Sequence, residues 1–262
     1  MTDQDYYNFR FSGIQRLYGL CGAESIRKGH VLVVGLGGVG SWVVESLART
    51  GIESLTLVDY DDICVSNTNR QLHATESNIG RMKTQALKDR VLSINKNCNV
   101  NLIEEIYSKD NESLVFKDDY DVVVDCIDKS IDKENLIVAC RERNTPVVVV
   151  GSAGGRQDLS KVKVSDLSQT EVDPLLHIMR KSLRKNHGFP RLPKKMDIPT
   201  VYSIETPMFP SEDGGVTTER PDKFLKPLDC QTGFGTATHI TGTFAFHATQ
   251  QSIRYLVTFA DK

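Results

Sequence analysis

A glycine-rich turn between a short apolar run and an amphipathic segment is the feature that most constrains the fold of this chain. Residues 30–40 read HVLVVGLGGVG, and SWVVESLARTG (41–51) follows. The β-branched run predicts a buried strand, and the apolar spacing after it predicts a helix. Glycines at such a junction let the backbone turn tightly and approach a phosphate, to which the helix N-terminus offers unsatisfied N–H groups. We therefore predict a nucleotide site that contains Gly35, Gly37, Gly38 and Gly40.

Strands and helices alternate after this unit. The predicted strands are 54–59, 99–105, 120–128 and 145–154, and the predicted helices are 77–95 and 132–144. Such alternation is typical of βαβ units, so the predicted fold class is α/β, with a doubly wound, mostly parallel Rossmann-like sheet.

The pattern weakens after residue 155. We expect a strand at 161–168, a helix at 238–257, and an irregular stretch rich in Pro, Lys and Arg from 174 to 240. A single domain over residues 1–262 fits this organisation best. Its nucleotide-binding core would span 1–155, and 156–262 would form a substrate-binding extension.

Composition excludes several classes of protein. The net charge of −2 over 262 residues gives no global attraction to nucleic acid. The six cysteines form no CxxC pair, which argues against a structural zinc site and a thioredoxin-like motif. The N-terminus lacks the pattern of a signal peptide, and no apolar run reaches membrane-spanning length. We expect a soluble, cytoplasmic protein with no membrane partner.

Acidic residues follow the second predicted strand, where residues 57–71 read LVDYDDICVSNTNRQ. Asp59 lies 24 residues after Gly35, the position from which a carboxylate accepts hydrogen bonds from ribose hydroxyls. Asp61 is assigned to the same nucleotide region. The glycine turn and Asp59 alone leave NAD, FAD and ATP open.

The polar residues that follow Asp61 favour ATP. They are Asn67, Asn69, Arg70, Gln71 and Lys83. A guanidinium and an ammonium at one end of a nucleotide suit a triphosphate, whose leaving-group charge grows in the transition state. Taken singly, Asn67, Asn69 and Lys83 are better explained by a turn, a cap or a solvated surface. Together they favour an ATP site with Arg70 and Lys83 as catalytic residues.

Asp128 is the last residue of YDVVVDCID, the strand predicted at 120–128. Ligands of open α/β sheets bind at the carboxyl ends of the strands. Mg²⁺ is commonly held by one or two carboxylates together with phosphate oxygens. We therefore predict that Asp128 is catalytic and binds Mg²⁺.

Five motifs keep the order of a known family. GLGGVGS, LVDYDD, NTNRQ, GRMK and DCID resemble the adenylating domain of ubiquitin-activating-like enzymes, the group that contains MoeB and ThiF, over about residues 10–155. These enzymes use ATP to convert a carboxylate into an acyl-adenylate. The resemblance implies that Arg70 and Lys83 contact the β- and γ-phosphates, Asp59 the ribose, Asn67 and Gln71 the phosphate region, and Asp128 the magnesium.

Two departures from MoeB and ThiF accompany this resemblance. Their paired CxxC zinc ligands are missing from this sequence. The resemblance implies a homodimer in which an N-terminal arginine reaches the partner's ATP. Here RFSGIQRLYG has Gly13 at that position, and Arg16 is the candidate replacement.

The rest of the chain resembles one branch of this superfamily, the tRNA threonylcarbamoyladenosine dehydratases. The carrying segments are RFSGIQRLYG, residues 151–185, and LDCQTGFGTATHITGTFAF (228–246). The resemblance implies ATP-dependent closure of the threonylcarbamoyl side chain, next to a tRNA anticodon, to a cyclic oxazolone. It also implies sulfur-relay partners, a cysteine desulfurase and its acceptor.

A basic segment supports an RNA substrate. No acid occurs from Pro174 to Met196, and the basic residues there are Arg180, Lys181, Arg184, Lys185, Arg191, Lys194 and Lys195. Such a stripe is the electrostatic footprint of a phosphate backbone. His187 and Phe189 are candidates for stacking on an unpaired base. A solvated, mobile basic loop is the alternative.

Cys230 is the one cysteine in a polar, glycine-rich setting. A thioester-forming nucleophile and a structural thiol are both open, and the second is favoured because dehydration needs no thioester. Two other functions remain open. An adenylyltransferase for a small sulfur-carrier protein would use the same fold, whereas a Rossmann oxidoreductase would leave Arg70, Lys83 and Asp128 without a role.

Overall fold

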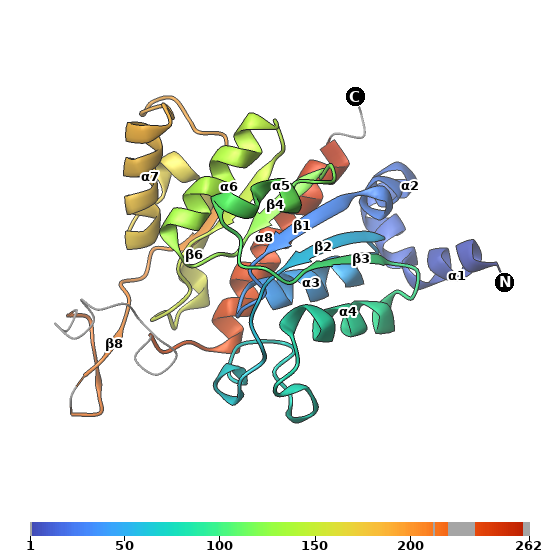
Figure 1. Cartoon of the computed structure of the whole chain (residues 1–262), viewed down its shortest axis with the longest axis horizontal. Helices are drawn as coiled ribbons and strands as arrows, with labels where there is room; N and C mark the ends of the chain where they lie inside the picture. The colour runs from blue at the N-terminus through green and yellow to red at the C-terminus, as the bar shows by residue number, and fades with distance from the viewer. Residues whose placement is uncertain (1, 212, 220–233, 259–262) are drawn as a thin grey trace.

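A seven-stranded sheet forms the centre of the computed structural model, which describes residues 2–211, 213–219 and 234–258. Its strands are β1 (His30–Val34), β2 (Ser54–Val58), β3 (Asn99–Ile103), β4 (Val122–Asp125), β5 (Val147–Val150), β6 (Val162–Asp166) and β7 (Pro199–Ser203). They lie in the order β3-β2-β1-β4-β5-β7-β6 (Figure 1). All neighbours pair in parallel except β6 and β7. The predicted doubly wound α/β fold is confirmed.

The strand order reverses between β1 and β4. Leu32 of β1 pairs with Thr56 of β2 on one side and with Val123 of β4 on the other. The chain builds outward from β1 to β3 and then returns to the opposite side of β1. In open α/β sheets, the crevice outside the carboxyl ends at such a switch point is where ligands bind.

Helices cover both faces of the sheet. One face carries α2 (Ser12–Lys28), α3 (Gly40–Arg49), α4 (Lys83–Ile94) and α8 (Thr238–Thr258), and the other carries α5 (Glu112–Val115), α6 (Ser130–Glu142) and α7 (Pro174–Asn186). Strands that are buried on both faces read as continuous apolar runs, as β1 and β5 do. Within the described ranges, no helix is long and apolar enough to cross a membrane.

Short elements complete the chain. They are α1 (Asp3–Arg10), the 3₁₀ helices η1 (Val65–Asn67), η2 (Glu76–Asn78), η3 (Lys109–Asn111), η4 (Leu159–Lys161) and η5 (Leu167–Gln169), and the hairpin strands β8 (Phe209–Pro210) and β9 (Val216–Thr217). No element was predicted before residue 30, yet α1 and α2 occupy most of that region. α2 is kinked at Gly19, whose φ is +73°.

The helix predicted at 77–95 begins later than expected. α4 starts at Lys83, because Gly80 adopts a left-handed φ of +79° and ends the preceding η2 turn. Lys83 is therefore the first residue of the helix. This places its side chain at the carboxyl edge of the sheet, where β2 ends.

The prediction of an irregular stretch from 174 to 240 was wrong for two elements. Asp173 caps α7 by accepting a hydrogen bond from the N–H of Leu176 (3.1 Å), and Pro174 occupies the first turn. Leu176, Met179 and Leu183 are fully buried along one helix face. The basic residues between them make the helical spacing of apolar residues hard to recognise in the sequence. Residues 199–203 then form β7, an interior strand between β5 and the edge strand β6.

Candidate active site

The glycine turn follows β1 and packs against the loop after β4. Gly35 has a φ of +87°, and a Cβ atom there would lie 2.8 Å from the carbonyl oxygen of Cys126. A Cβ on Gly40 would lie 1.8 Å from the oxygen of Gly35. Neither position can carry a side chain without moving the backbone. The turn therefore has the close packing expected of a phosphate-binding loop.

The N-terminus of α3 follows the glycine turn directly, and the N–H groups of Ser41 and Trp42 there donate to the carbonyls of Gly37 and Val39. No side chain caps it at Val39, so its first N–H groups lack side-chain partners within the described residues. The Nε2 atom of Gln71 comes within 3.9 Å of where a Cβ of Gly37 would stand. The buried Oε1 atom of Gln71 has no hydrogen-bond partner among the described residues. Gln71 thus lines the turn with an unused acceptor.

Asp59 is fixed beside the same turn. Its Oδ2 atom accepts a hydrogen bond from the N–H of Leu36 (2.6 Å), and its Oδ1 atom accepts one from the N–H of Asp61 (2.9 Å). The carboxylate joins the end of β2 to the loop after β1. This is the geometry in which an acid can reach a ribose hydroxyl.

Lys83 projects into this acidic corner. Its side chain is only 7% exposed, and its Nζ atom lies 2.6 Å from Oδ2 of Asp61 and 3.7 Å from Oδ1 of Asp59. Most lysines on helices extend into solvent, whereas the side chain of Lys83 is buried. The structure brings together the predicted Asp59, Asp61 and Lys83.

Arg70 is anchored next to the glycine turn. Its Nη1 atom donates to the carbonyl of Ser66 (2.8 Å) and to Oδ1 of Asn69 (3.0 Å). Its own carbonyl accepts a hydrogen bond from Nε1 of Trp42 (3.1 Å), which lies on α3. The Cγ atom of Arg70 would contact a Cβ of Gly38 at 3.4 Å. The arginine stem therefore lies against the predicted phosphate-binding loop.

The two asparagines shape the polar loop. Oδ1 of the buried Asn67 accepts from the N–H of Cys64 (3.0 Å), and Nδ2 of Asn69 donates to the carbonyl of Thr236 (2.9 Å). Thr238, at the start of α8, donates back to the carbonyl of Asn69 (2.6 Å). Helix α8 therefore holds this loop in place. Nucleotide contacts of Asn67 and Asn69 stay predictions.

Asp128 is exposed in the loop between β4 and α6, at the same edge of the sheet as the glycine turn. No group of three or more potential metal ligands occurs in the part of the chain that the structure describes. A single carboxylate still fits Mg²⁺, which takes most of its ligands from phosphates and water. Asp128 fits this donor set, and its role stays a prediction.

An ion pair that the sequence patterns did not reveal stabilises the same loop. The Nζ atom of Lys133 lies 2.9 Å from Oδ1 of Asp125, and neither side chain is exposed. Lys133 also donates to the carbonyls of Asp125 (3.2 Å) and Ile127 (3.0 Å). The pair fixes the backbone that carries Asp128 and contacts Gly35. An acid at the end of a buried strand and a lysine on the apolar face of the next helix were the available signal.

His73 is a second buried polar residue that was missed. Both of its ring nitrogens are buried and have no hydrogen-bond partner within the described residues. Burial, and to a smaller extent the charge of Lys83, lowers its pKa to about 4. The imidazole is therefore neutral at pH 7.

We expect His73 to make stability depend on pH. The unfolded chain binds the proton near pH 6.5 and the folded chain only near pH 4, so stability that is present above pH 6.5 is lost as the pH falls through 4. The loss amounts to about 3 kcal/mol. Urea unfolding at a series of pH values should show this slope in the wild type and lose it in His73→Leu. The control is the variant His239→Leu, which changes an exposed histidine and should keep the wild-type slope. An unchanged slope in His73→Leu would contradict the assignment.

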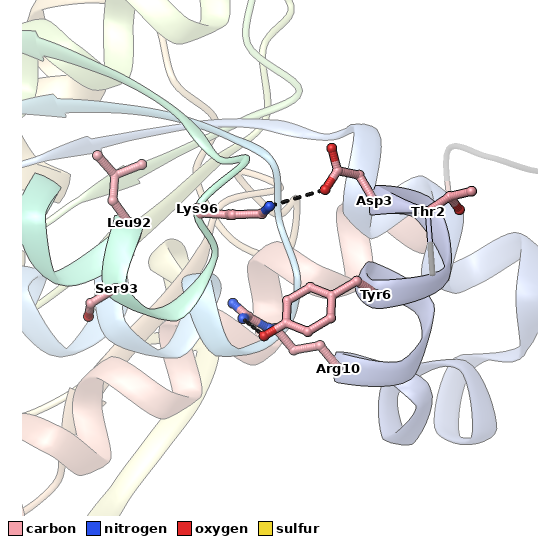
Figure 2. Close-up of a pocket in the computed structure, with 7 residues that line it drawn as sticks. All are labelled: Thr2, Asp3, Tyr6, Arg10, Leu92, Ser93 and Lys96. Atoms are coloured by element: carbon pink, nitrogen blue, oxygen red, sulfur yellow. Dashed lines mark hydrogen bonds and ion pairs between the residues drawn. The ribbon is translucent and has the colours of Figure 1, made fainter.

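A surface hollow of about 340 Å³ lies away from these residues, between α1 and the end of α4 (Figure 2). Nζ of Lys96 contacts Oδ1 of Asp3 (3.1 Å) there, and Arg10 donates to the hydroxyl of Tyr6 (2.8 Å). Lys83 marks the other end of α4, about 15 Å away along the helix axis. The hollow is thus at the amino edge of the sheet and does not contribute to the candidate site.

The basic segment is a helix followed by a turn. Lys181, Lys185, Arg191, Lys194 and Lys195 are exposed. The partly buried Arg180 and Arg184 donate to Oγ1 of Thr170 and to the carbonyl of Pro190, respectively. α7 begins at the carboxyl edge of the sheet, where Asp173 contacts Ser152, and the segment ends just before β7. The segment therefore runs from the carboxyl edge of the sheet to the opposite edge, where β7 begins.

The expectation that Phe189 stacks on a base is wrong, and that for the partly exposed His187 stays a prediction. Phe189 is buried, and the guanidinium of Arg141 lies 4.0 Å from the centre of its ring. Nε2 of His187 is 3.0 Å from Oε1 of Glu134. Both rings serve the packing of α7 on α6. Cys230 lies outside the described residues.

The sheet order, the glycine turn and the converging charged side chains define a nucleotide-binding α/β protein with an adenylating-enzyme layout. The sequence pattern of the ThiF family matches residues 12–257, and the chain belongs to that family. Within it, the chain is similar to the tRNA threonylcarbamoyladenosine dehydratases. It is 43% identical to the Haemophilus influenzae protein over 98% of this chain and 97% of that one.

The dehydratase of Escherichia coli is similar over its whole length. It is 39% identical over 97% of this chain and 95% of the relative. The crystal structure of that enzyme in complex with ATP superposes with a TM-score of 0.87 and covers 100% of this chain and 99% of its own. The similarity thus includes the extension after residue 155 as well as the nucleotide-binding core.

Proposed function

We propose that this protein catalyses the ATP-dependent dehydration of threonylcarbamoyladenosine, next to a tRNA anticodon, to its cyclic oxazolone form. Two cations carry the proposal, Arg70 against Gly38 and Lys83 beside Asp59, because positive charge next to the glycine turn suits a triphosphate. Full-length similarity to dehydratases, one of them solved with ATP, supports the substrate. ATP is a consumed co-substrate in this reaction.

Some residues of the candidate site bind the nucleotide, and others stabilise the charge that develops during the reaction. The glycine turn and the N-terminus of α3 bind phosphate oxygens, and Asp59 accepts from the ribose. Arg70 and Lys83 stabilise the negative charge that develops on the departing pyrophosphate. Mg²⁺, held by Asp128, would neutralise phosphate charge. Asn67, Asn69, Asp61 and Gln71 support these groups from the polar loop.

The chemistry is one activation followed by one ring closure. A carboxylate oxygen of the substrate attacks the α-phosphorus, and pyrophosphate leaves. A carbamoyl oxygen of the same side chain then attacks the activated carbonyl carbon, AMP leaves with the original carboxylate oxygen, and the nitrogen loses a proton. The substrate has lost one water in total. Lys83 and Arg70 act in the first step, where charge moves onto the leaving group.

Nucleoside mass after incubation with ATP, Mg²⁺ and tRNA that carries threonylcarbamoyladenosine tests the function. We expect the modified nucleoside to lose one water only when ATP is present. Adenylation of a small carrier protein, with no change on the tRNA, would instead support the alternative adenylyltransferase. Similarity over nearly the full length of the dehydratases favours the first outcome.

We also propose that the basic segment binds the tRNA backbone. The paired variant Lys194→Ala/Lys195→Ala should weaken tRNA binding and make the slope of log affinity against log salt shallower by about 2. Its turnover at saturating tRNA should stay unchanged, because both lysines lie next to the start of β7 and away from the glycine turn. Lys109→Ala/Lys117→Ala, two exposed lysines elsewhere, is the matched control. Equal affinities for the two variants in a filter-binding titration would reject the assignment.

The assembly proposals rest on the N-terminal helices and on the family. Phe9, Leu17 and Leu20 are more than 70% exposed on α1 and α2, and an isologous dimer would cover them. The exposed Arg16 would reach the partner's nucleotide in place of an arginine at Gly13. A cytoplasmic location, sulfur-relay partners and a single domain, with a 1–155 core and a 156–262 extension, stay proposals as well.

A further inference from the structure

Arg156 is an arginine buried at the carboxyl edge of the sheet, in the loop after β5. It is 3% exposed, and its Nε and Nη1 atoms have no hydrogen-bond partner in the described part of the chain. Removing a guanidinium from water costs several kcal/mol unless its charge and N–H groups find partners. A desolvated cation with free N–H groups is therefore a site prepared for an anion.

The nearest acids do not fill this role. Burial lowers the pKa of Arg156, and the charges of Asp173 and Glu205 oppose that shift. Both acids are committed to backbone N–H groups. Asp173 accepts from Ser152 (2.8 Å) and caps α7, and Oε2 of Glu205 accepts from Gln157 and Asp158 at 3.0 Å each. They attract the guanidinium from a distance but leave Nε and Nη1 unbonded.

The backbone before Arg156 is locked. Gly155 donates its N–H to the carbonyl of Gly235 (2.8 Å) and accepts from the N–H of Met208 (2.8 Å). Its φ is +70°, and a Cβ there would lie 2.7 Å from the oxygen of Met208. Three segments that are distant in sequence thus hold the arginine in one place, which is the pre-organisation expected of a recognition residue.

The position of Arg156 in the fold indicates which anion it would bind. β1, β4, β5 and β7 are parallel neighbours, so the loops after them share one edge of the sheet. The triphosphate residues lie on the β1–β2 side of that edge, and Asp128 follows β4. Arg156 lies in the loop after β5, a strand that is two places, or about 10 Å, from β1 in the sheet. With the predicted nucleotide residues on the β1–β2 side, the loops on the β5–β7 side are left for the acyl group.

We propose that Arg156 binds the carboxylate of the acyl substrate and presents it for activation. Charge-assisted N–H bonds to a carboxylate are about twice as strong as neutral ones, and they orient the oxygen that attacks. This inference rests on the proposed function, since it assumes that a carboxylate is the group activated.

The test compares two ligands that differ only in this group. Binding of the free nucleoside threonylcarbamoyladenosine and of its carboxamide is measured by calorimetry on wild type, Arg156→Met and Arg156→Lys, alongside ATP affinity. We expect the wild type to prefer the carboxylate by tenfold or more, and Arg156→Met to lose that preference while its ATP affinity changes less than twofold. Arg156→Lys should retain part of it. Arg143→Met, at the far end of α6, is the matched control.

Two outcomes would overturn the proposal. A tenfold loss of ATP affinity in Arg156→Met, with the ligand preference retained, would make the nucleotide phosphate the anion. An unchanged preference and unchanged ATP affinity would make Arg156 purely structural. If Arg156→Met does not fold, the preference in Arg156→Lys decides between the same outcomes. Absence of turnover by the wild type would reject the proposed function, whereas turnover with unaltered discrimination in the variants rejects only this inference.

Discussion

Replacing Lys83 with alanine will reduce turnover at least about 10³-fold, and Arg70→Ala will have an effect of similar size. The stem of Arg70 lies against Gly38, and Lys83 lies beside Asp59, whose carboxylate accepts a hydrogen bond from Leu36 in the glycine turn. The loss should appear in kcat at saturating ATP, because the stabilised charge develops in the transition state. Single-turnover pyrophosphate release, measured for each variant, checks the step that is affected.

Arg81→Ala is the matched control for both variants. Arg81 lies two residues before Lys83, but its exposed side chain pairs with Asp89 at the surface (2.6 Å). It should retain wild-type turnover. Thermal unfolding separates loss of catalysis from loss of fold, and a folded Lys83→Ala variant with more than a tenth of the wild-type rate would remove Lys83 from the catalytic residues.

Lys133→Met will destabilise the protein by about 3–5 kcal/mol, because Asp125 is left with an unpaired charge in the interior. Methionine keeps most of the volume of the lysine stem, so the loss reflects charge rather than a cavity. The free energy of unfolding in urea measures it. Since the pair also fixes the loop of Asp128, the surviving folded fraction should need a higher Mg²⁺ concentration for half-maximal activity.

The double variant Asp125→Asn/Lys133→Met isolates the pairing. Removing both charges should recover much of the lost stability, because neither partner is then buried alone. A loss below about 1 kcal/mol in the single variant, or no recovery in the double, would show that the pair is not a coupled unit.

The central part of the fold was predictable from the sequence for a physical reason. β1, β4 and β5 are buried on both faces, so each is a short, almost purely apolar run between polar turns. The glycine turn was equally clear, since Gly35 and Gly40 stand where no Cβ fits. These are constraints that act within about ten residues of chain, and a local pattern captures them.

Two of the elements that were missed are α7 and β7. The first is an amphipathic helix with a strongly polar face, and the second depends on pairing with strands that are distant in sequence. α7 carries four basic residues among its buried apolar ones. β7 has an apolar run of only two residues, Val201 and Tyr202, and its position depends on pairing with β5 and β6. Phe189 looked available for a base because its contact, Arg141, lies on another helix.

The residues of the candidate site also fall into those that the sequence could indicate and those that it could not. Motif spacing reflects the strand–turn–helix geometry, so it could indicate that Asp59 and Lys83 lie together and that Arg70 lies against the glycine turn, while their roles stay predictions. Lys133, His73 and Arg156 could not, because what distinguishes them is burial, and sequence alone does not show which polar residues are buried. Each of the three is a polar group whose environment matters more than its type.

The most direct test of the account follows one oxygen atom. Threonylcarbamoyladenosine in tRNA is prepared with ¹⁸O in the carboxylate and converted by the enzyme with ATP in ordinary water. If the carboxylate attacks the α-phosphorus, AMP will carry one ¹⁸O atom and the cyclic product will retain the other. Label in inorganic phosphate, or AMP without label, would contradict carboxylate adenylation at this site.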